Sequence, residues 1–248
     1  MRLMTPARRL VRLVLILLLP LAAIFVWSLP DSFDVRYEFS YMIMLFAVIL
    51  ATAAYLIGVA SAGAEHYGMT TAEFGTGLAR LLGLLTALTL LLGALWTGAF
   101  RIVAGLRGTT DGLTTGDWLS FGLTGLRGLG LVLASGAVGF AVTSLGRRIS
   151  VGLLALVAAA VAQGAVGVVT GVADTTWAEL YFSPMWVGAW MTEEVEMIDP
   201  ASCDFERVPD CAFDTLTLTR PMAGSAIAAL TIMVVGVAVW AAHRRADD

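Results

Sequence analysis

Six apolar stretches, five without a charge and one broken by a single arginine, are each long enough to cross a lipid bilayer and occupy most of this 248-residue chain. A helix rises about 1.5 Å per residue, so roughly 20 apolar residues cover a hydrocarbon core about 30 Å thick. The composition agrees, since 58% of the residues are hydrophobic and only 14% are charged. We therefore predict an all-α polytopic membrane protein whose six transmembrane helices form a single domain. The expected spans cover residues 13–29, 41–62, 81–100, 118–145, 149–173 and 221–242.

The basic residues between these stretches predict the orientation of the chain. All fifteen basic residues are arginines, and a cytoplasmic N-terminus places nine of them inside and five outside. Cytoplasmic loops of membrane proteins carry such an excess of arginine, so we expect both termini in the cytoplasm. The first stretch ends in Trp27-Ser28-Leu29 without the small residues of a signal-peptide cleavage site, so it is expected to stay as a helix. The nine inner arginines are Arg2, Arg8, Arg9, Arg12, Arg80, Arg147, Arg148, Arg244 and Arg245.

The longest connection, residues 174–220, falls outside the membrane in this orientation. Its aromatic first part, from Trp177 to Trp190, predicts two short helical pieces at the outer interface. An acidic stretch from Glu193 to Asp214 follows and contains both cysteines of the chain, Cys203 and Cys211. The oxidising compartment favours a disulfide bridge between them, and two unpaired thiols are the alternative.

A search for catalytic motifs in the sequence finds no phosphate-binding loop, no metalloprotease motif and no Cys-x-x-Cys pair. Both histidines, His66 and His243, fall on the inner side, far from Ser135 in the middle of a span and far from the cysteines. This separation argues against a serine protease and against a zinc site. We expect no enzymatic activity, no metal and no cofactor in this chain.

Two features inside the spans allow two interpretations each. Glycines recur in the fourth and fifth spans, where they indicate either tight packing within one bundle or a contact between subunits. Arg127 is the one charge inside an expected span, and such a residue is costly enough to be a functional candidate. The alternative is that the span begins near Gly128 and that Arg127 extends toward the outer surface.

The order of spans and loops resembles that of ABC-2 type permeases, the membrane subunits of ATP-binding-cassette exporters. The resemblance covers essentially the whole chain and rests on architecture more than on motifs. The usual proline-serine-arginine before the third span is replaced here by Thr76-Gly77-Leu78-Ala79-Arg80. The local elements that match are Ala64-Glu65-His66-Tyr67-Gly68-Met69-Thr70 with Glu73, Gly75 and Thr76, then Thr143-Ser144-Leu145-Gly146-Arg147-Arg148, and His243-Arg244-Arg245 after the last span.

The resemblance implies a permease in a bacterial plasma membrane that exports an amphiphilic or hydrophobic substrate. It implies two kinds of partner, namely cytoplasmic ATPase subunits that bind ATP and magnesium, and a second permease subunit that makes a homodimer or a heterodimer. No nucleic acid is expected. The implied ATPase-coupling element, part of an inner loop expected from Gly63 to Arg80, comprises Glu65, His66, Tyr67, Glu73 and Arg80. Candidates for the pathway or its outer gate are Arg127, Trp177, Tyr181, Phe182, Trp186 and Trp190.

A function of another class fits the same sequence. The acidic outer loop, closed by the expected disulfide, is also suited to bind a ligand or a partner protein. In that case the chain is a membrane scaffold or sensor subunit. An ATPase that purifies with the chain separates the exporter from this alternative.

Overall fold

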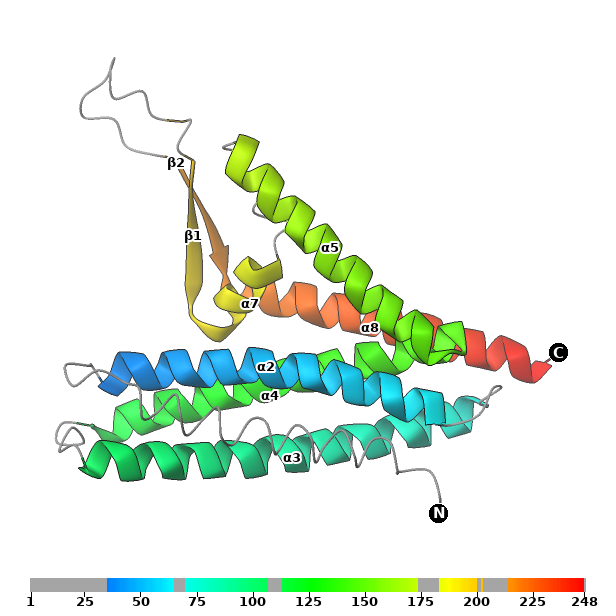
Figure 1. Ribbon diagram of the computed structural model, residues 1–248, viewed down its shortest axis with the longest axis horizontal. Helices are drawn as coiled ribbons and strands as arrows, with labels where there is room; N and C mark the ends of the chain where they lie inside the picture. Colours follow the sequence, from blue (N-terminus) through cyan, green and yellow to red (C-terminus); the bar gives the residue numbers. More distant parts are fainter. Residues whose placement is uncertain are drawn as a thin grey trace. The chain divides into compact units, whose positions relative to one another are not determined.

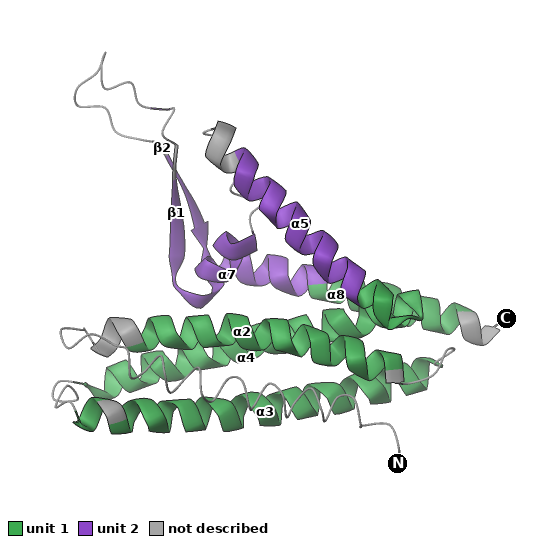
Figure 2. Ribbon diagram, viewed as in Figure 1, with its two compact units in different colours: residues 1–152, 231–248 green, residues 153–230 purple. Residues whose placement is uncertain are grey.

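The computed structural model describes residues 35–64, 70–106, 113–173, 183–199, 202 and 214–247. Within these ranges five helices are long and apolar enough to cross a membrane (Figure 1), which is compatible with a multi-pass membrane protein. The expected first span, residues 13–29, lies outside the described residues. The chain divides into two compact units, residues 1–152 with 231–248 and residues 153–230 (Figure 2).

The five long helices cover the five expected spans in this part of the chain. Helix α5 has the expected bounds, and α2, α4 and α8 extend beyond theirs at both ends, by one to six residues. Helix α3 departs most, because it begins ten residues before the expected span, so residues 71–80 are helical and not a loop. The bounds are Val35–Ala64 for α2, Thr71–Leu106 for α3, Thr115–Gly146 for α4, Ile149–Ala173 for α5 and Arg220–Asp247 for α8.

A capping box explains the early start of α3. The hydroxyl of Thr70 accepts a hydrogen bond from the Glu73 backbone N–H at 3.3 Å, and the Glu73 carboxylate accepts one from the Thr70 backbone N–H at 2.8 Å. Thr114 and Asp117 form the same reciprocal pair at the start of α4. Each box satisfies backbone donors that a helix leaves unpaired in its first turn. The expected inner loop is therefore shorter than its sequence suggests.

In the first unit, α2 packs mainly against α4, and α3 contacts both. Small residues allow this close approach. A Cβ atom added to Gly58 would meet the Gly136 carbonyl group and would lie 2.8 Å from the backbone nitrogen of Phe140. A Cβ atom on Gly139 would likewise meet the backbone of Tyr55. At Gly136 and Gly139 the glycines thus serve packing within one bundle, the first of the two interpretations.

The turn between α4 and α5 is short and has an unusual backbone. Arg147 follows the last residue of α4 with φ of 54° and ψ of 18°, in the left-handed region that glycine usually occupies at this position. The start of α5 is held within the same unit, because the Tyr55 hydroxyl of α2 donates a hydrogen bond of 2.9 Å to the Gly152 carbonyl oxygen.

The second unit contains a β-hairpin that the expected all-α class did not include. Strands β1, Glu194–Asp199, and β2, Asp214–Thr219, pair antiparallel (Figure 1). The register joins Val195 to Leu218, so apolar side chains lie opposite one another on one face. Glu196 pairs with Thr217 on the other face. Both ends of the expected acidic stretch are thus strands, and the cysteines between them lie outside the described residues.

A short helix and two polar contacts complete the second unit. Helix α7, Ser183–Met191, is one of the two expected helical pieces; the residues of the other, from Trp177 onward, lie outside the described ranges. The side-chain oxygen of Gln163 in α5 accepts a hydrogen bond of 2.6 Å from the Ser183 backbone N–H. At the other end, the Arg220 guanidinium donates to the Thr192 carbonyl oxygen at 2.6 Å and pairs with Glu193 at 3.4 Å.

Candidate functional site

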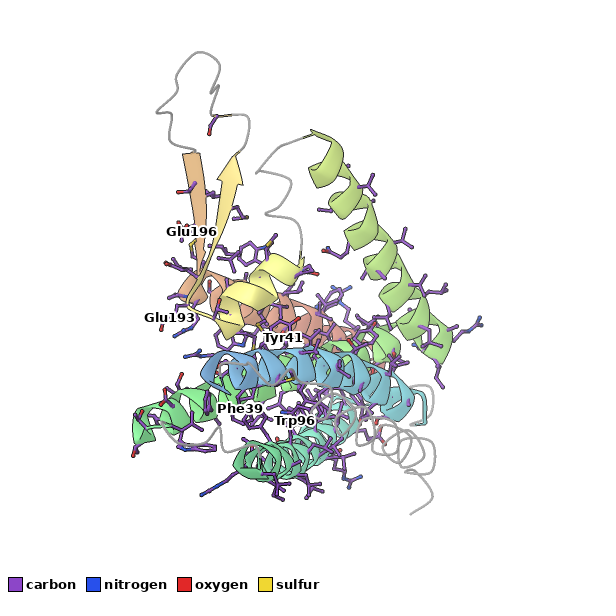
Figure 3. All side chains as sticks on the ribbon, turned by 60° about the vertical axis from the view of Figure 1, so that its left-hand side comes forward. Phe39, Tyr41, Trp96, Glu193 and Glu196 are labelled. Atoms are coloured by element: carbon purple, nitrogen blue, oxygen red, sulfur yellow. The ribbon has the colours of Figure 1, made fainter. Side chains whose placement is uncertain are left out.

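A cavity of about 300 Å³ lies between α2, α3 and α4 in the first unit. Aromatic, aliphatic and glycine residues make up most of its lining, and none of the described residues that line it is charged. Binding pockets are mostly apolar with a few polar groups, and their volumes begin near this size. Figure 3 shows Phe39 and Trp96, two of the lining residues, in the space between α2 and α3.

Aromatic rings close the end of the cavity that the charge pattern predicts to face outside. Phe39 stacks on Phe100 with ring centroids 4.2 Å apart and meets the edge of Phe121 at 4.6 Å. Trp118 packs edge to face with Phe121 at 5.7 Å, and the Arg101 guanidinium lies over Trp118 at 5.7 Å. Aromatic pairs of this geometry add to the stabilisation from burial alone. This end of the bundle is therefore a fixed cluster of rings.

Trp96 is a buried part of the cavity wall. Its ring stacks on Phe46 with centroids 5.3 Å apart and planes inclined by 8°, and only 7% of the residue is exposed. The indole Nε1–H has no hydrogen-bond partner among the described residues. A buried donor without a partner is uncommon in folded proteins and requires an explanation.

Three glycines keep the cavity open. Gly93 lies on α3, and Gly122 and Gly125 lie on α4. A Cβ atom added at any of them would meet nothing within 4 Å, unlike the close contacts at Gly58 and Gly139. Glycine thus has two uses in this unit, since it allows helix contact at some positions and leaves space at others.

The described residues of the expected coupling element lie at the start of α3. Glu73 is exposed, and the hydrogen bonds from the Thr70 backbone N–H and hydroxyl lower the pKa of its carboxyl group. Glu73 precedes the uncharged stretch that begins after Arg80. Arg80 is also exposed. Glu65, His66 and Tyr67 lie outside the described residues, so the structure does not show whether the element is assembled.

Three candidates for a pathway or gate lie within the described residues, and none of these three lines the cavity. Arg127 lies within α4 and is half-buried, and it is not among the lining residues. Because α4 is continuous from Thr115, Arg127 belongs to the helix and not to a loop before it. Trp186 and Trp190 of α7 pack against the hairpin cluster that includes Met197. The remaining candidates, Trp177, Tyr181 and Phe182, lie outside the described residues, as do Cys203 and Cys211.

The cavity itself was not predicted from the sequence. Trp96 and Trp118 carry the signature of anchors at the membrane interface, but Trp96 is buried against Phe46. The sequence of α3 does indicate one buried helix face, because large apolar residues recur there every three or four positions. This face contains Leu81, Leu85, Leu88, Leu92, Trp96 and Phe100.

Among the described residues no group of three or more histidine, cysteine, aspartate or glutamate side chains is placed to hold a metal ion. The mostly apolar cavity is thus the candidate site for an apolar molecule. Comparisons with protein-family models, with curated proteins and with solved structures gave no match for this chain. The resemblance to ABC-2 permeases accordingly stays a prediction from architecture, and the chain's function is argued from its own residues.

Proposed function

We propose that this chain is the membrane subunit of an ATP-driven exporter in a bacterial plasma membrane. It moves an amphiphilic or hydrophobic molecule, and a separate ATPase subunit binds ATP and magnesium and supplies the energy. A second permease subunit completes the transporter. Five membrane-length helices and an apolar cavity within the first unit support this proposal.

The observation that carries the proposal is the continuity of α3. This helix begins at Thr71, beside Glu73, and runs without interruption past Gly93 and Trp96, which line the cavity. From Glu73 to Trp96 the axis covers about 35 Å at 1.5 Å per residue. A continuous helix moves as one rigid element, so a displacement at its predicted cytoplasmic end reaches the cavity wall.

The lining of the cavity favours an apolar cargo over an ion. Burial of an isolated charge is very costly unless a partner of opposite charge or a metal compensates it. The described lining includes the side chains of Thr89 and Thr97 but no ionised side chain. Uncharged amphiphiles therefore match the site better than inorganic ions.

Purification of the tagged chain in mild detergent tests the proposal directly. We expect a nucleotide-binding subunit to purify with it and the reconstituted complex to hydrolyse ATP. Purification without an ATPase, combined with no ATPase gene beside that of the chain, would overturn the exporter assignment.

Glu73→Gln tests the role of α3 in coupling. Glutamine keeps an oxygen that can accept the capping hydrogen bond but removes the charge. We expect a several-fold loss of substrate-stimulated ATPase activity at an unchanged level of protein in the membrane. Asp117→Asn makes the same exchange in the capping box of α4 and should leave the activity unchanged. Full stimulation in Glu73→Gln would show that Glu73 only caps the helix.

A scaffold or sensor subunit is the second candidate, and the hairpin favours it. Glu194 and Glu196 are exposed on β1 (Figure 3 labels Glu196), while Val195 and Met197 pack on α7 and β2. This arrangement presents a row of acidic side chains on a supported strand. A partner retained by the chain and lost on Glu194→Gln with Glu196→Gln, in the absence of any ATPase, would favour this function.

A further inference from the structure

We infer that the cavity between α2, α3 and α4 is a binding site for one phospholipid, with an acyl chain in the cavity and the phosphate on the guanidinium of Arg101. In the predicted orientation this lipid belongs to the outer leaflet. The inference goes beyond the proposed function, because it concerns the binding of a membrane lipid and needs no ATPase.

The cavity is open at its side. Leu90 of α3 and Leu126 of α4 line it, and each is more than half exposed, whereas the lining residues Phe39 and Leu50 of α2 are buried. Helix α2 is therefore the floor, and α3 and α4 are the edges. Because these helices are long and apolar enough to cross a membrane, the open side faces hydrocarbon in a bilayer. A lipid tail can enter there without passing through water.

Arg101 continues one edge of the cavity. Leu90, Ala94 and Thr97 line the cavity at intervals of four and three residues, so they form one row along α3. Arg101 comes four residues later in the same row and is exposed. Its guanidinium carbon lies over the ring of Trp118, 5.7 Å from the centroid, and Trp118 lines the cavity from α4. The positive charge thus lies beside the end of the cavity.

The guanidinium of Arg101 is free to bind an anion. Among the described residues no carboxylate pairs with it and no oxygen accepts a hydrogen bond from it. Arginine stays charged and presents five N–H donors in a planar fork that fits the oxygens of a phosphate. A phosphate diester therefore complements this end of the cavity, and only an uncharged tail enters the apolar part.

The depth of Arg101 in a bilayer also suits a phosphate. The stretch between Arg80 and Arg101 contains no charge, and both arginines are exposed. At 1.5 Å per residue they are about 32 Å apart along α3, slightly more than the thickness of a hydrocarbon core of about 30 Å. When α3 crosses the bilayer, Arg101 lies at the level of the headgroups and the cavity begins beneath it.

The length of the cavity matches the acyl chains of one leaflet. From Arg101 to Leu90 the axis of α3 covers about 16 Å, and half of a hydrocarbon core is about 15 Å. On α4 the facing row runs over the same length from Trp118 through Gly122 and Gly125 to Leu129. A Cβ atom on either glycine would meet nothing within 4 Å, so this row leaves room for a chain.

The volume agrees with a single chain. A cavity of about 150 Å³ can hold the six carbons of benzene, so a volume of about 300 Å³ accommodates roughly a dozen carbon atoms. This number is most of one acyl chain and too few for two. The second chain of the lipid would stay in the surrounding bilayer.

Native mass spectrometry of the full-length protein, released from detergent, tests the inference with two lipids. Palmitoyl-oleoyl phosphatidylglycerol and palmitoyl-oleoyl glycerol have the same acyl chains, but only the first has a phosphate. We expect the wild type to bind the first phosphatidylglycerol molecule about fivefold more tightly than the diacylglycerol, the factor for one arginine near a charged membrane surface.

Two variants separate the two halves of the site. Arg101→Gln should bind phosphatidylglycerol only as tightly as diacylglycerol. Gly125→Leu places a side chain in the cavity and should bind both lipids more weakly than the wild type. Arg148→Gln, at another exposed arginine, and Gly236→Leu, at an open glycine of α8 outside the lining, are the matched controls and should bind as the wild type does. Circular dichroism checks that each variant keeps its helices.

Three results would overturn the inference. Equal affinities of the wild type for both lipids would remove the role of Arg101. Unchanged lipid binding in folded Gly125→Leu would show that the lipid lies elsewhere. A lipid-free dimer of the wild type that Gly125→Leu converts to monomers would assign the cavity to a second copy of the chain. Because no ATPase takes part in these measurements, their failure is separate from failure of the exporter proposal.

Discussion

Gly58→Ala should weaken the contact between α2 and α4 more than any glycine substitution at an open position. The added Cβ atom would lie 2.8 Å from the Phe140 nitrogen, about 0.6 Å short of ordinary contact, and still closer to the Gly136 carbonyl oxygen. All of these neighbours are backbone atoms, which cannot rotate away. The helices must then separate, and a gap of this size forfeits about a quarter of each dispersion contact across the interface.

The net cost follows from two opposing effects. Overpacking of a tight interface costs roughly 1 to 3 kcal/mol, and a backbone neighbour places Gly58→Ala at about 3. Replacement of a helical glycine by alanine returns about 1 kcal/mol. We therefore expect a net loss of about 2 kcal/mol, which is about a 30-fold change in the unfolding equilibrium constant.

The assay is unfolding by sodium dodecyl sulfate in mixed micelles, followed by circular dichroism. Gly83→Ala is the control, because its Cβ atom meets nothing within 4 Å and only the helix preference remains. Its stability should equal or slightly exceed that of the wild type. If Gly58→Ala proves as stable as Gly83→Ala, the two helices are not in the close contact described here.

Three further changes test other parts of the structure. Arg220→Gln should increase hydrogen exchange at the base of the hairpin, with a loss of about 1 kcal/mol for the hydrogen bond to the Thr192 carbonyl oxygen. Glu193→Gln should change little, because its carboxylate is exposed. Arg147→Gly should leave the free energy of unfolding unchanged or raise it by up to about 1 kcal/mol, since glycine adopts the left-handed conformation without a steric cost. A fall in the midpoint of thermal unfolding would contradict the left-handed backbone at Arg147. Alkylation of the untreated protein followed by mass spectrometry should label neither Cys203 nor Cys211, and two labelled thiols would exclude the predicted bridge.

The positions of the membrane-length helices follow directly from the sequence. Because a bilayer offers no water to unpaired backbone groups, any long uncharged stretch within it forms a helix, as residues 149–173 do without adjustment. The early start of α3 was missed, although Thr70 and Glu73 have the spacing of a capping box. The hydrogen bonds between Thr70 and Glu73 start the helix before its apolar stretch begins.

The hairpin was missed for a different reason. Residues 214–219 alternate polar and apolar side chains, and residues 194–197 do the same, which is the pattern of half-buried strands. The acidic character of the segment masked this alternation. The cavity was beyond reach, since no spacing within one helix indicates that Phe46, Trp96 and Gly125 meet from three helices.

The hydrogen bond between Gln163 and Ser183 has a consequence for the depth of the outer segment. Gln163 lies within α5, about 15 Å along the axis from its end at Ala173. If α5 crosses the bilayer, Ser183 lies at the depth of Gln163 and not at the outer end of the helix. Helix α7 is then a re-entrant element, whose first amide is satisfied by a side chain where water is scarce.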